Sequence, residues 1–177
     1  GVQTCALPIS SDLIVIAQGH KRKNLAAMGQ TIAEKVFTRN SLAGGTAMAG
    51  DLIDARIDAL MVRNWPRVRG LFAQLGFHNG PPVVWDAERA VVVIEHNQPP
   101  LDEKSARGNL EARRDAARLG LKHFHDSELG IGQQMMMDYG HVRPGGLVVG
   151  NDSHTIACGA LNAVATGIGY EIGRAHV

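Results

Sequence analysis

The chain has 177 residues, of which 45% are hydrophobic and 20% are charged, and its formal net charge at neutral pH is +1. A chain of this length can bury the core of one domain, and its near-neutral charge gives no electrostatic basis for binding nucleic acid or an anionic membrane surface. No apolar run is long enough to span a membrane, and residues 13–17 are too short for the core of a signal peptide, so we expect a soluble, cytoplasmic protein.

Both ends of the chain differ in pattern from what lies between them. Residues 1–10 (GVQTCALPIS) and 171–177 (EIGRAHV) resemble the translation of a sequencing adapter, with one copy at each end. Residues 11–27 form a mixed segment without a clear period, and Met28 fits a true start. We therefore expect one partial domain over residues 28–170.

The first half of this domain predicts a helix, a strand and a second helix. Thr31 and Glu34 have the spacing of a capping box at the start of the first helix. Pro66 suits the first turn of the second helix, and Gly76 suits its end. The predicted segments are a helix over residues 30–40, a strand over residues 51–62 that ends near Arg63, and a helix over residues 66–75.

The second half continues the alternation of strands and helices. Residues 91–94 are four β-branched residues in a row, and the apolar run 147–149 ends at Gly150, which allows a sharp turn. A helix over residues 104–119 should turn Ala106, Leu110 and Ala117 toward the core. A short strand is expected around Phe124. Two further helical segments are expected from Met135 and from Asp152 to Gly169.

This alternation favours an α/β fold with three α/β/α layers and a mostly parallel sheet. Two of the predicted strands end in an acid followed by a histidine. Glu95 and His96 follow one strand, and Asp152, Ser153 and His154 follow the other. Since the carboxyl ends of parallel strands lie along one edge of the sheet, we expect these residues to meet there.

A carboxylate beside an imidazole orients it and raises its basicity, which suits proton transfer. The plain structural alternative is that Glu95 is a turn residue and that Asp152, Ser153 or Thr155 caps a helix, with an anion near its free N–H groups. Two such pairs at equivalent places favour a catalytic site.

The remaining histidines carry a weaker signal. His123 and His125 flank one residue of a strand, so they share a face and could bind a metal, although polar residues of an edge strand explain them better. His20, His78 and His141 lie in polar or turn contexts and are expected on the surface. The three consecutive methionines from Met135 are expected to fill the core.

Several segments together resemble the amino-terminal part of the aconitase family. The most specific is VGNDSHT at residues 149–155, and it is followed by GAL at 159–161 and ATGIG at 165–169. Supporting segments are MGQTIAEK at 28–35, Gly50-Asp51, ARID at 55–58, Glu95-His96, KSA at 104–106 and Pro144-Gly145. Within the family, the large subunits of the isopropylmalate dehydratases are the branch that these segments resemble most.

The resemblance implies a hydro-lyase that acts on a small di- or tricarboxylate hydroxy acid and works with a separate small subunit. It also implies a [4Fe–4S] cluster with one iron that binds substrate as a Lewis acid. By position, His96, His154 and Asp152 match catalytic residues of the family. Glu95 stands where the family usually has an aspartate.

The resemblance further places Ser153 and Gln133 among the substrate-binding residues. Gln133 replaces a histidine that the family usually has, so we expect Asp152 to lack its imidazole partner, unless Gln133 is a misread histidine. The cluster cysteines of the family lie beyond the matched region, and Cys158 is not at a ligand position. With only Cys5 and Cys158 available, we expect this chain alone to hold no cluster and no other metal.

Three alternatives remain open from the sequence. Within the family, the substrate could be that of aconitase, of homoaconitase or of a dimethylmalate-type dehydratase. A mononuclear metal hydrolase could use Glu95, His96, Asp152 and His154 as ligands. A nucleic-acid-binding relative is the non-enzyme alternative, and the net charge of +1 argues against it.

Overall fold

The computed structural model describes residues 13–16, 29–80, 83–84, 86–96, 98–126 and 130–169, with the backbone alone for residues 13–16. The predicted adapter segments, residues 1–10 and 171–177, lie outside the described residues. The elements in chain order are β1 (Leu13–Ile16), α1 (Ile32–Asn40), β2 (Leu52–Ala55), β3 (Ala59–Arg63), α2 (Trp65–Gln74), β4 (Ala90–Val93), α3 (Glu103–Arg118), β5 (His123–His125), α4 (Gly132–Asp138), β6 (Leu147–Gly150), the 3₁₀ helix η2 (Ser153–Leu161) and β7 (Val164–Gly167).

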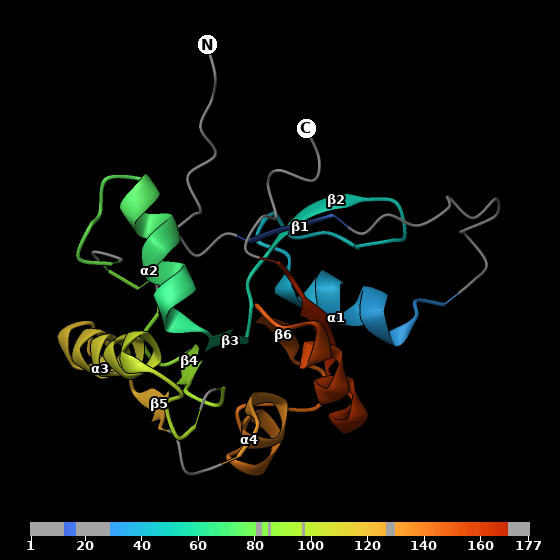
Figure 1. Cartoon of the computed structure of the whole chain (residues 1–177). Coiled ribbons are helices and arrows are strands. Elements are labelled where there is room, and N and C mark those ends of the chain that lie inside the picture. The colour runs from blue at the N-terminus through green and yellow to red at the C-terminus, as the bar shows by residue number, and fades with distance from the viewer. Residues whose placement is uncertain are drawn as a thin grey trace.

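The main sheet has five strands in the order β5-β4-β3-β6-β7, and all of its neighbouring pairs are parallel (Figure 1). The predicted α/β class with a mostly parallel sheet is therefore confirmed. β1 and β2 form a separate antiparallel pair. β1 lies within residues 11–27, for which the sequence predicted no element.

The direction in which the strands are added reverses at β3. From β3 the chain moves outward through α2 to β4 and through α3 to β5, and it then returns through α4 to β6 on the other side of β3. In open α/β sheets, ligands bind in the crevice beyond the carboxyl ends of the strands at such a switch point. The topology alone thus predicts a ligand site at the carboxyl ends of β3 and β6.

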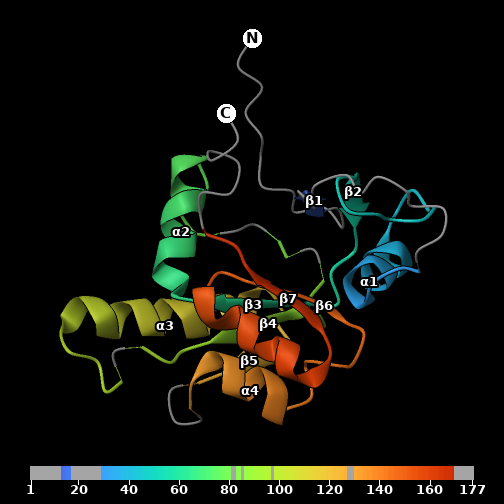
Figure 2. The same ribbon diagram turned by 90° about the vertical axis from the view of Figure 1, so that its right-hand side faces the viewer.

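Helices cover both faces of the sheet (Figure 2). On one face, Met61, Val91 and Val148 pack with Met135 and Met136 of α4. The other face is covered by α1, α2 and α3 through two apolar clusters. The first cluster contains Val36, Ala55, Ile57, Leu147 and Val149. The second contains Val62, Trp65, Val92, Ile94 and Ala112. The three-layer arrangement follows from strands whose alternate side chains are buried on both faces.

Several elements form where the sequence predicted them. α1 begins with the expected capping box, in which the Glu34 amide donates to Thr31 Oγ1 at 3.2 Å and the Thr31 amide donates to Glu34 Oε2 at 2.7 Å. α2 has its proline in the first turn and Gly76 beyond its end at φ +90°. β4, β5 and β6 also lie where they were predicted.

The single strand predicted over residues 51–62 is wrong, because the chain forms two strands there that belong to different sheets. The break lies at Asp58. Its carboxylate accepts a hydrogen bond from the Leu147 amide at 2.8 Å, and its own amide donates to the Leu147 carbonyl at 2.8 Å. These long-range bonds redirect the chain into the parallel sheet, which alternation along the sequence could not predict.

The helix predicted from Asp152 to Gly169 is also wrong. A 3₁₀ helix ends at Leu161, Asn162 takes the left-handed conformation at φ 59°, and β7 follows. No side chain of Asp152 caps the helix. The Thr155 hydroxyl instead donates to the Asp152 carbonyl at 2.6 Å, which leaves the Asp152 carboxylate available for other contacts.

The face predicted for the long helix is wrong as well. In α3, Ala106, Leu110 and Ala117 are exposed, and the residues that face the interior are Gly108, Ala112, Asp115 and Ala116. Gly108 lies against Pro66, where a Cβ atom would be 2.5 Å from the proline ring. A small residue and a buried acid therefore face α2, contrary to the usual apolar stripe.

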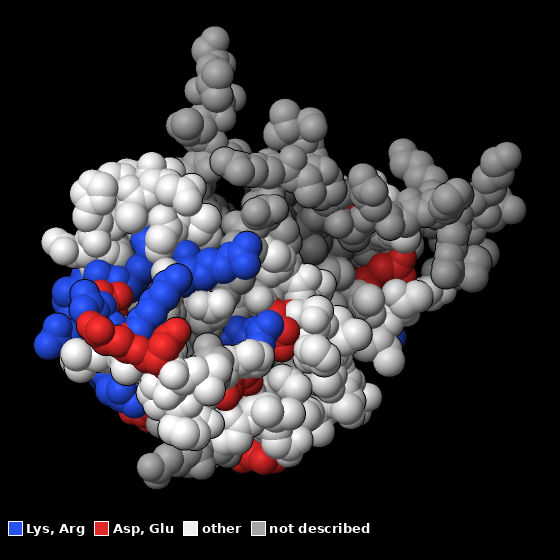
Figure 3. All heavy atoms as spheres, in the orientation of Figure 1, with Lys and Arg blue, Asp and Glu red and all other residues white. Residues whose placement is uncertain are grey.

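The charged surface is concentrated over α2 and α3, where basic and acidic side chains alternate (Figure 3). Arg107 pairs with Glu103 at 2.7 Å, and Arg113 pairs with Asp126 at 2.6 Å. Opposite charges thus accompany the basic side chains on this surface. Among the described residues, each helix is too short or too polar to cross a membrane.

Candidate functional site

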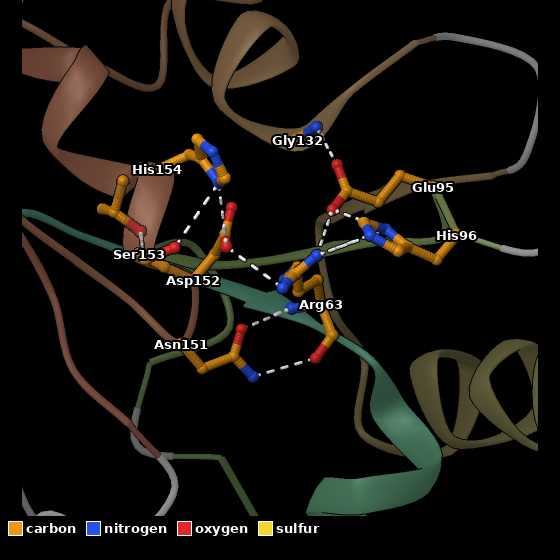
Figure 4. A network of polar contacts seen from close by, with 9 residues as sticks. Arg63, Glu95, His96, Gly132, Asn151, Asp152, Ser153 and His154 are labelled. Atoms are coloured by element: carbon orange, nitrogen blue, oxygen red, sulfur yellow. Dashed lines mark hydrogen bonds and ion pairs between the residues drawn. The ribbon is translucent and has the colours of Figure 1, made fainter.

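Polar side chains from the ends of three neighbouring strands meet at the carboxyl edge of the sheet (Figure 4). Arg63 is the last residue of β3, Glu95 and His96 follow β4, and Asp152 and His154 follow β6. We call these five residues the rim cluster. It lies at the topological switch point, and it brings together the two acid–histidine pairs that the sequence placed at equivalent strand ends.

Arg63 joins the two pairs. Its Nη1 lies 3.2 Å from Glu95 Oε1, and its Nη2 lies 3.1 Å from Asp152 Oδ1. Both carboxylate side chains are 3% exposed, whereas that of Arg63 is 26% exposed. One guanidinium therefore compensates two buried carboxylates, and this makes the cluster electrostatically interdependent.

Asn151 fixes the backbone from which Arg63 projects. Its Oδ1 accepts a hydrogen bond from the Arg63 amide at 2.8 Å, and its Nδ2 donates to the Arg63 carbonyl at 2.9 Å. The Asn151 amide also donates to the Met61 carbonyl at 3.1 Å. The end of β3 and the turn after β6 are thus held together by one side chain.

Glu95 is held from the opposite side by the start of α4. The amide of Gly132 donates a short hydrogen bond to Glu95 Oε2. A Cβ atom at Gly132 would lie 2.9 Å from that oxygen, so a larger residue there would displace the Glu95 carboxylate. His96 Nδ1 lies 3.1 Å from Glu95 Oε1, and the imidazole is 66% exposed. The pair therefore consists of a fixed buried carboxylate and an accessible imidazole.

The second pair has a similar arrangement with fewer hydrogen bonds. His154 Nδ1 lies 3.5 Å from Asp152 Oδ1 and 3.5 Å from Ser153 Oγ, and the imidazole is 73% exposed. Within the described part of the chain, Asp152 Oδ1 is buried and accepts no well-aligned hydrogen bond. Asp152 therefore keeps acceptor capacity that Glu95 uses on Gly132.

The turn that presents Asp152 depends on Gly150. This residue is the last of β6, and a Cβ atom there would collide with the side chain of Thr155. Thr155 is completely buried, and its hydroxyl donates to the Asp152 carbonyl. The motif GNDSHT thus has a structural reason at most of its positions, and Asp152, Ser153 and His154 remain as its chemical part.

Comparison with known proteins identifies the family. The sequence profile of the aconitase family (aconitate hydratase) matches residues 82–173, just over half of the chain. The chain belongs to the aconitase family. The match includes both acid–histidine pairs, and it supports the resemblance that the motif segments suggested.

Individual relatives point in the same direction. This aconitase-family chain is 40% identical over 143 residues to the 3-isopropylmalate dehydratase large subunit 1 of Methanopyrus kandleri, which covers 80% of the chain and 33% of the relative. It is 35% identical over 143 residues to the 3-isopropylmalate dehydratase large subunit of Methanoregula boonei, with the same coverage of 80% and 33%. The chain spans about a third of the length of these curated relatives.

A third relative carries a different name. The chain is 37% identical over 123 residues to the protein named "Probable methanogen homoaconitase large subunit" in Methanothermobacter thermautotrophicus, which covers 68% of the chain and 28% of the relative. Both names denote large subunits. The comparisons therefore favour the isopropylmalate branch by extent of match and retain homoaconitase as an alternative.

Gln133 lies in the first turn of α4, half-buried, directly after the Gly132 amide that holds Glu95. No hydrogen bond joins it to Asp152 in the described part of the chain. In this aconitase-family chain, the groups beside Asp152 are the Arg63 guanidinium at 3.1 Å and the His154 imidazole at 3.5 Å, and not a side chain from position 133.

Sequence reasoning missed Arg63 and Asn151. The available signal was position, because Arg63 ends a β-strand in the same way that Glu95 and Asp152 follow theirs. That signal was weak while residues 51–62 were taken as one long strand. Only the pairing of β3 with both β4 and β6 places Arg63 between the two carboxylates.

The described residues offer little for a metal or a cluster. They contain no group of three or more His, Cys, Asp or Glu side chains arranged to hold a metal ion, and the Arg63 guanidinium lies between the two rim carboxylates. Cys158 is completely buried, and burial raises the pKa of its thiol. A [4Fe–4S] cluster is held mainly by cysteine thiolates, so these residues do not fit one by themselves.

His141 is not on the open surface as predicted. Its Nε2 lies 2.7 Å from Nε2 of His125, and its ring centroid is 4.6 Å from that of His123. Burial, followed by the charges of the two neighbouring histidines, lowers the pKa of His141 to about 4. These three histidines form a packed contact between β5 and the segment that follows α4.

Proposed function

We propose that the longer protein containing this chain is a hydro-lyase of the 3-isopropylmalate dehydratase type. It converts 2-isopropylmalate to 3-isopropylmalate in leucine biosynthesis, in the cytoplasm. The observation that carries this proposal is the pair of acid–histidine pairs joined at one strand edge by Arg63. The identity of 40% to a relative named 3-isopropylmalate dehydratase large subunit supports the choice of substrate.

The geometry suits the chemistry of moving a hydroxyl between neighbouring carbons. The reaction removes a hydroxyl and a proton as water to give an unsaturated acid, and water then returns with the opposite orientation. Protons must therefore be moved at two carbons. His96 on Glu95 and His154 on Asp152 are exposed imidazoles on buried carboxylates, so each can exchange a proton with a substrate. Ser153 and Gln133 are proposed to bind substrate.

The charge of the rim cluster indicates that other parts of the longer protein complete the site. Two carboxylates and one guanidinium leave a net negative charge while the histidines are neutral, and a dicarboxylate would be repelled. We propose that a [4Fe–4S] cluster and a separate small subunit supply the missing groups. The names of the relatives, which denote large subunits, support the second part.

Residues 28–170 are proposed as the genuine part of a three-layer domain, with residues 1–10 and 171–177 as adapter translation and residues 11–27 unassigned. β1 pairs with β2 from within the unassigned segment, which supports translation of at least that part. The genomic sequence of the source would test this directly. A natural gene that encodes both terminal segments would contradict the proposal.

The decisive experiment uses the longer gene, expressed with its small subunit and reconstituted with iron and sulfide. Isomerisation of 2-isopropylmalate, followed by absorbance of the unsaturated acid, is expected for the parent. D152N should lower kcat by roughly two to four orders of magnitude, because the carboxylate that orients His154 is lost. D54N, which changes an exposed aspartate of β2, is the matched control.

A parent enzyme active on the homoaconitase substrate but inactive on isopropylmalate would replace the first candidate by the second. A D152N variant with the activity of the D54N control would contradict the role of the rim cluster. We also expect the 177-residue chain alone to show no turnover after iron–sulfur reconstitution. Measurable turnover by the chain alone would show that the described site is sufficient.

A further inference from the structure

Arg63 is the residue on which both halves of the site depend. We propose that Arg63 is a positioning residue. It fixes the separation of the two acid–histidine pairs and determines which ring nitrogen of His96 carries the hydrogen. This inference rests on the proposed function for its catalytic meaning. Its structural content concerns this chain alone.

The contacts of His96 define the proton position. Arg63 Nη1 lies 2.9 Å from His96 Nε2 and 3.3 Å from His96 Nδ1, and Glu95 Oε1 lies 3.1 Å from Nδ1. A guanidinium only donates and a carboxylate only accepts. Nε2 is the ring nitrogen nearer to Arg63, and Nδ1 also faces Glu95. These contacts favour the tautomer in which Nε2 accepts from Arg63 and Nδ1 carries the hydrogen.

The separation of the two pairs depends on the shape of the guanidinium. Nη1 contacts Glu95 and Nη2 contacts Asp152, so the width of one planar group sets the distance between two carboxylates. The two hydrogen bonds between the Asn151 side chain and the Arg63 backbone fix the position from which the Arg63 side chain projects. A lysine carries the same charge on a single nitrogen and cannot make both contacts in this geometry.

The charges around His96 predict how it responds when Arg63 is removed. Glu95 faces His96 from the end of β4, and Arg63 faces it from the end of β3. Asp152 and His154 follow β6 and lie on the other side of Arg63. From α4, Gly132 contributes only its backbone amide to Glu95. Glu95 favours the hydrogen on Nδ1, and Arg63 is the donor that favours an unprotonated Nε2. Removing Arg63 should therefore let part of the population carry the hydrogen on Nε2.

The test uses the 177-residue chain, labelled with ¹⁵N-histidine and studied by NMR across pH. H96Q assigns the His96 signals. In the parent at high pH, the ¹⁵N shifts should report a protonated Nδ1 and an unprotonated Nε2. In R63Q at the same pH, the two ¹⁵N shifts of His96 should move toward each other, because the donor that favours an unprotonated Nε2 is lost.

Two further variants separate positioning from a merely structural role. R63K keeps a charged donor, so the ¹⁵N shifts of His96 should stay near the parent values, whereas in the longer enzyme its kcat should fall because the contact with both carboxylates is lost. R107Q removes an arginine from an exposed pair on α3 and should leave the ¹⁵N shifts of His96 unchanged. The ¹⁵N shifts of His154, which contacts Asp152 and not Arg63, should change less than those of His96.

An unprotonated Nδ1 in the parent would overturn the proposal even if every Arg63 variant failed to fold. A folded R63Q chain with unchanged ¹⁵N shifts of His96 would also overturn it. Both measurements use this chain and do not require enzyme activity. A longer protein that lacks dehydratase activity would therefore refute the proposed function, and the NMR result would not be affected.

Discussion

The chain buries carboxylates together with arginines in two places, and the two places are built in opposite ways. Between α2 and α3, the single carboxylate of Asp115 accepts from the Trp65 indole at 2.8 Å, from Arg69 through a short bond, and from Arg118 at 3.0 Å. At the rim cluster, one guanidinium serves two carboxylates. The first site has three donor side chains for one carboxylate, and the second has one guanidinium for two carboxylates.

This difference separates a structural carboxylate from a reactive one. Burial raises the pKa of Asp115, but the hydrogen bonds from Trp65, Arg69 and Arg118 outweigh it, so the pKa lies below its ordinary value. Asp115 therefore has no acceptor capacity left for a ligand. Asp152 has a buried oxygen without an aligned hydrogen bond in the described residues, and an exposed imidazole beside it.

The largest effect on stability is expected from D115N. The substitution leaves two arginines and an indole N–H around a group that is neutral, and removing one partner of a buried pair should cost about 3 kcal/mol in the free energy of unfolding. Urea denaturation of the chain measures it, with E103Q on the exposed face of α3 as control. A loss as small as that of E103Q would mean that Asp115 does not hold α2 and α3 together.

A smaller effect is expected from pH, through the contact between His125 and His141. Burial, followed by the charge of His123, lowers the pKa of His125, and that of His141 falls to about 4. Since both folded pKa values lie below the unfolded value, the unfolded chain binds more protons, and this stability is present above about pH 6.5 and lost as the pH falls toward 4.

The measurement for this pair is the melting temperature by circular dichroism between pH 7 and pH 4.5, above the range where Asp115 is protonated. The melting temperature should fall with pH in the parent. The fall should be shallower in H141Q and unchanged in H78Q, which alters an exposed histidine. An identical slope in H141Q and the parent would exclude His141 as the cause.

The smallest effect on stability is expected from D152N. The substitution loses one ion pair with Arg63, but it also removes the repulsion between two buried carboxylates and the cost of burying one of these charges. The free energy of unfolding should therefore change by less than about 1 kcal/mol. The same denaturation experiment checks it beside D115N. A loss equal to that of D115N would mean that Asp152 is a structural residue and would remove the contrast between the two sites.

Local signals predicted much of the fold. The capping box of Thr31 and Glu34, the proline of α2 and the β-branched run of β4 act over a few residues, and each formed as expected. Prediction failed where distant groups decide. Asp58 divides a strand through its bonds to Leu147, and Asp115 turns α3 so that Leu110 faces solvent.

The rim cluster divides in the same way. The residues of the two acid–histidine pairs are adjacent in the chain and follow recognisable strands, so the sequence alone located Glu95, His96, Asp152 and His154 at equivalent strand ends. Arg63 carries no local mark, because an arginine at the end of a strand is ordinary. Its importance comes from the order β4-β3-β6, which places it between two carboxylates.

The sequence by itself determined the family, the layered α/β class and the chemical residues of the motif GNDSHT, because these depend on short-range patterns. The tertiary structure alone decided which group compensates the buried charges. A cation stabilises carboxylates only at distances of a few ångströms, and those distances arise from the pairing of strands that lie 32 and 88 residues apart along the chain.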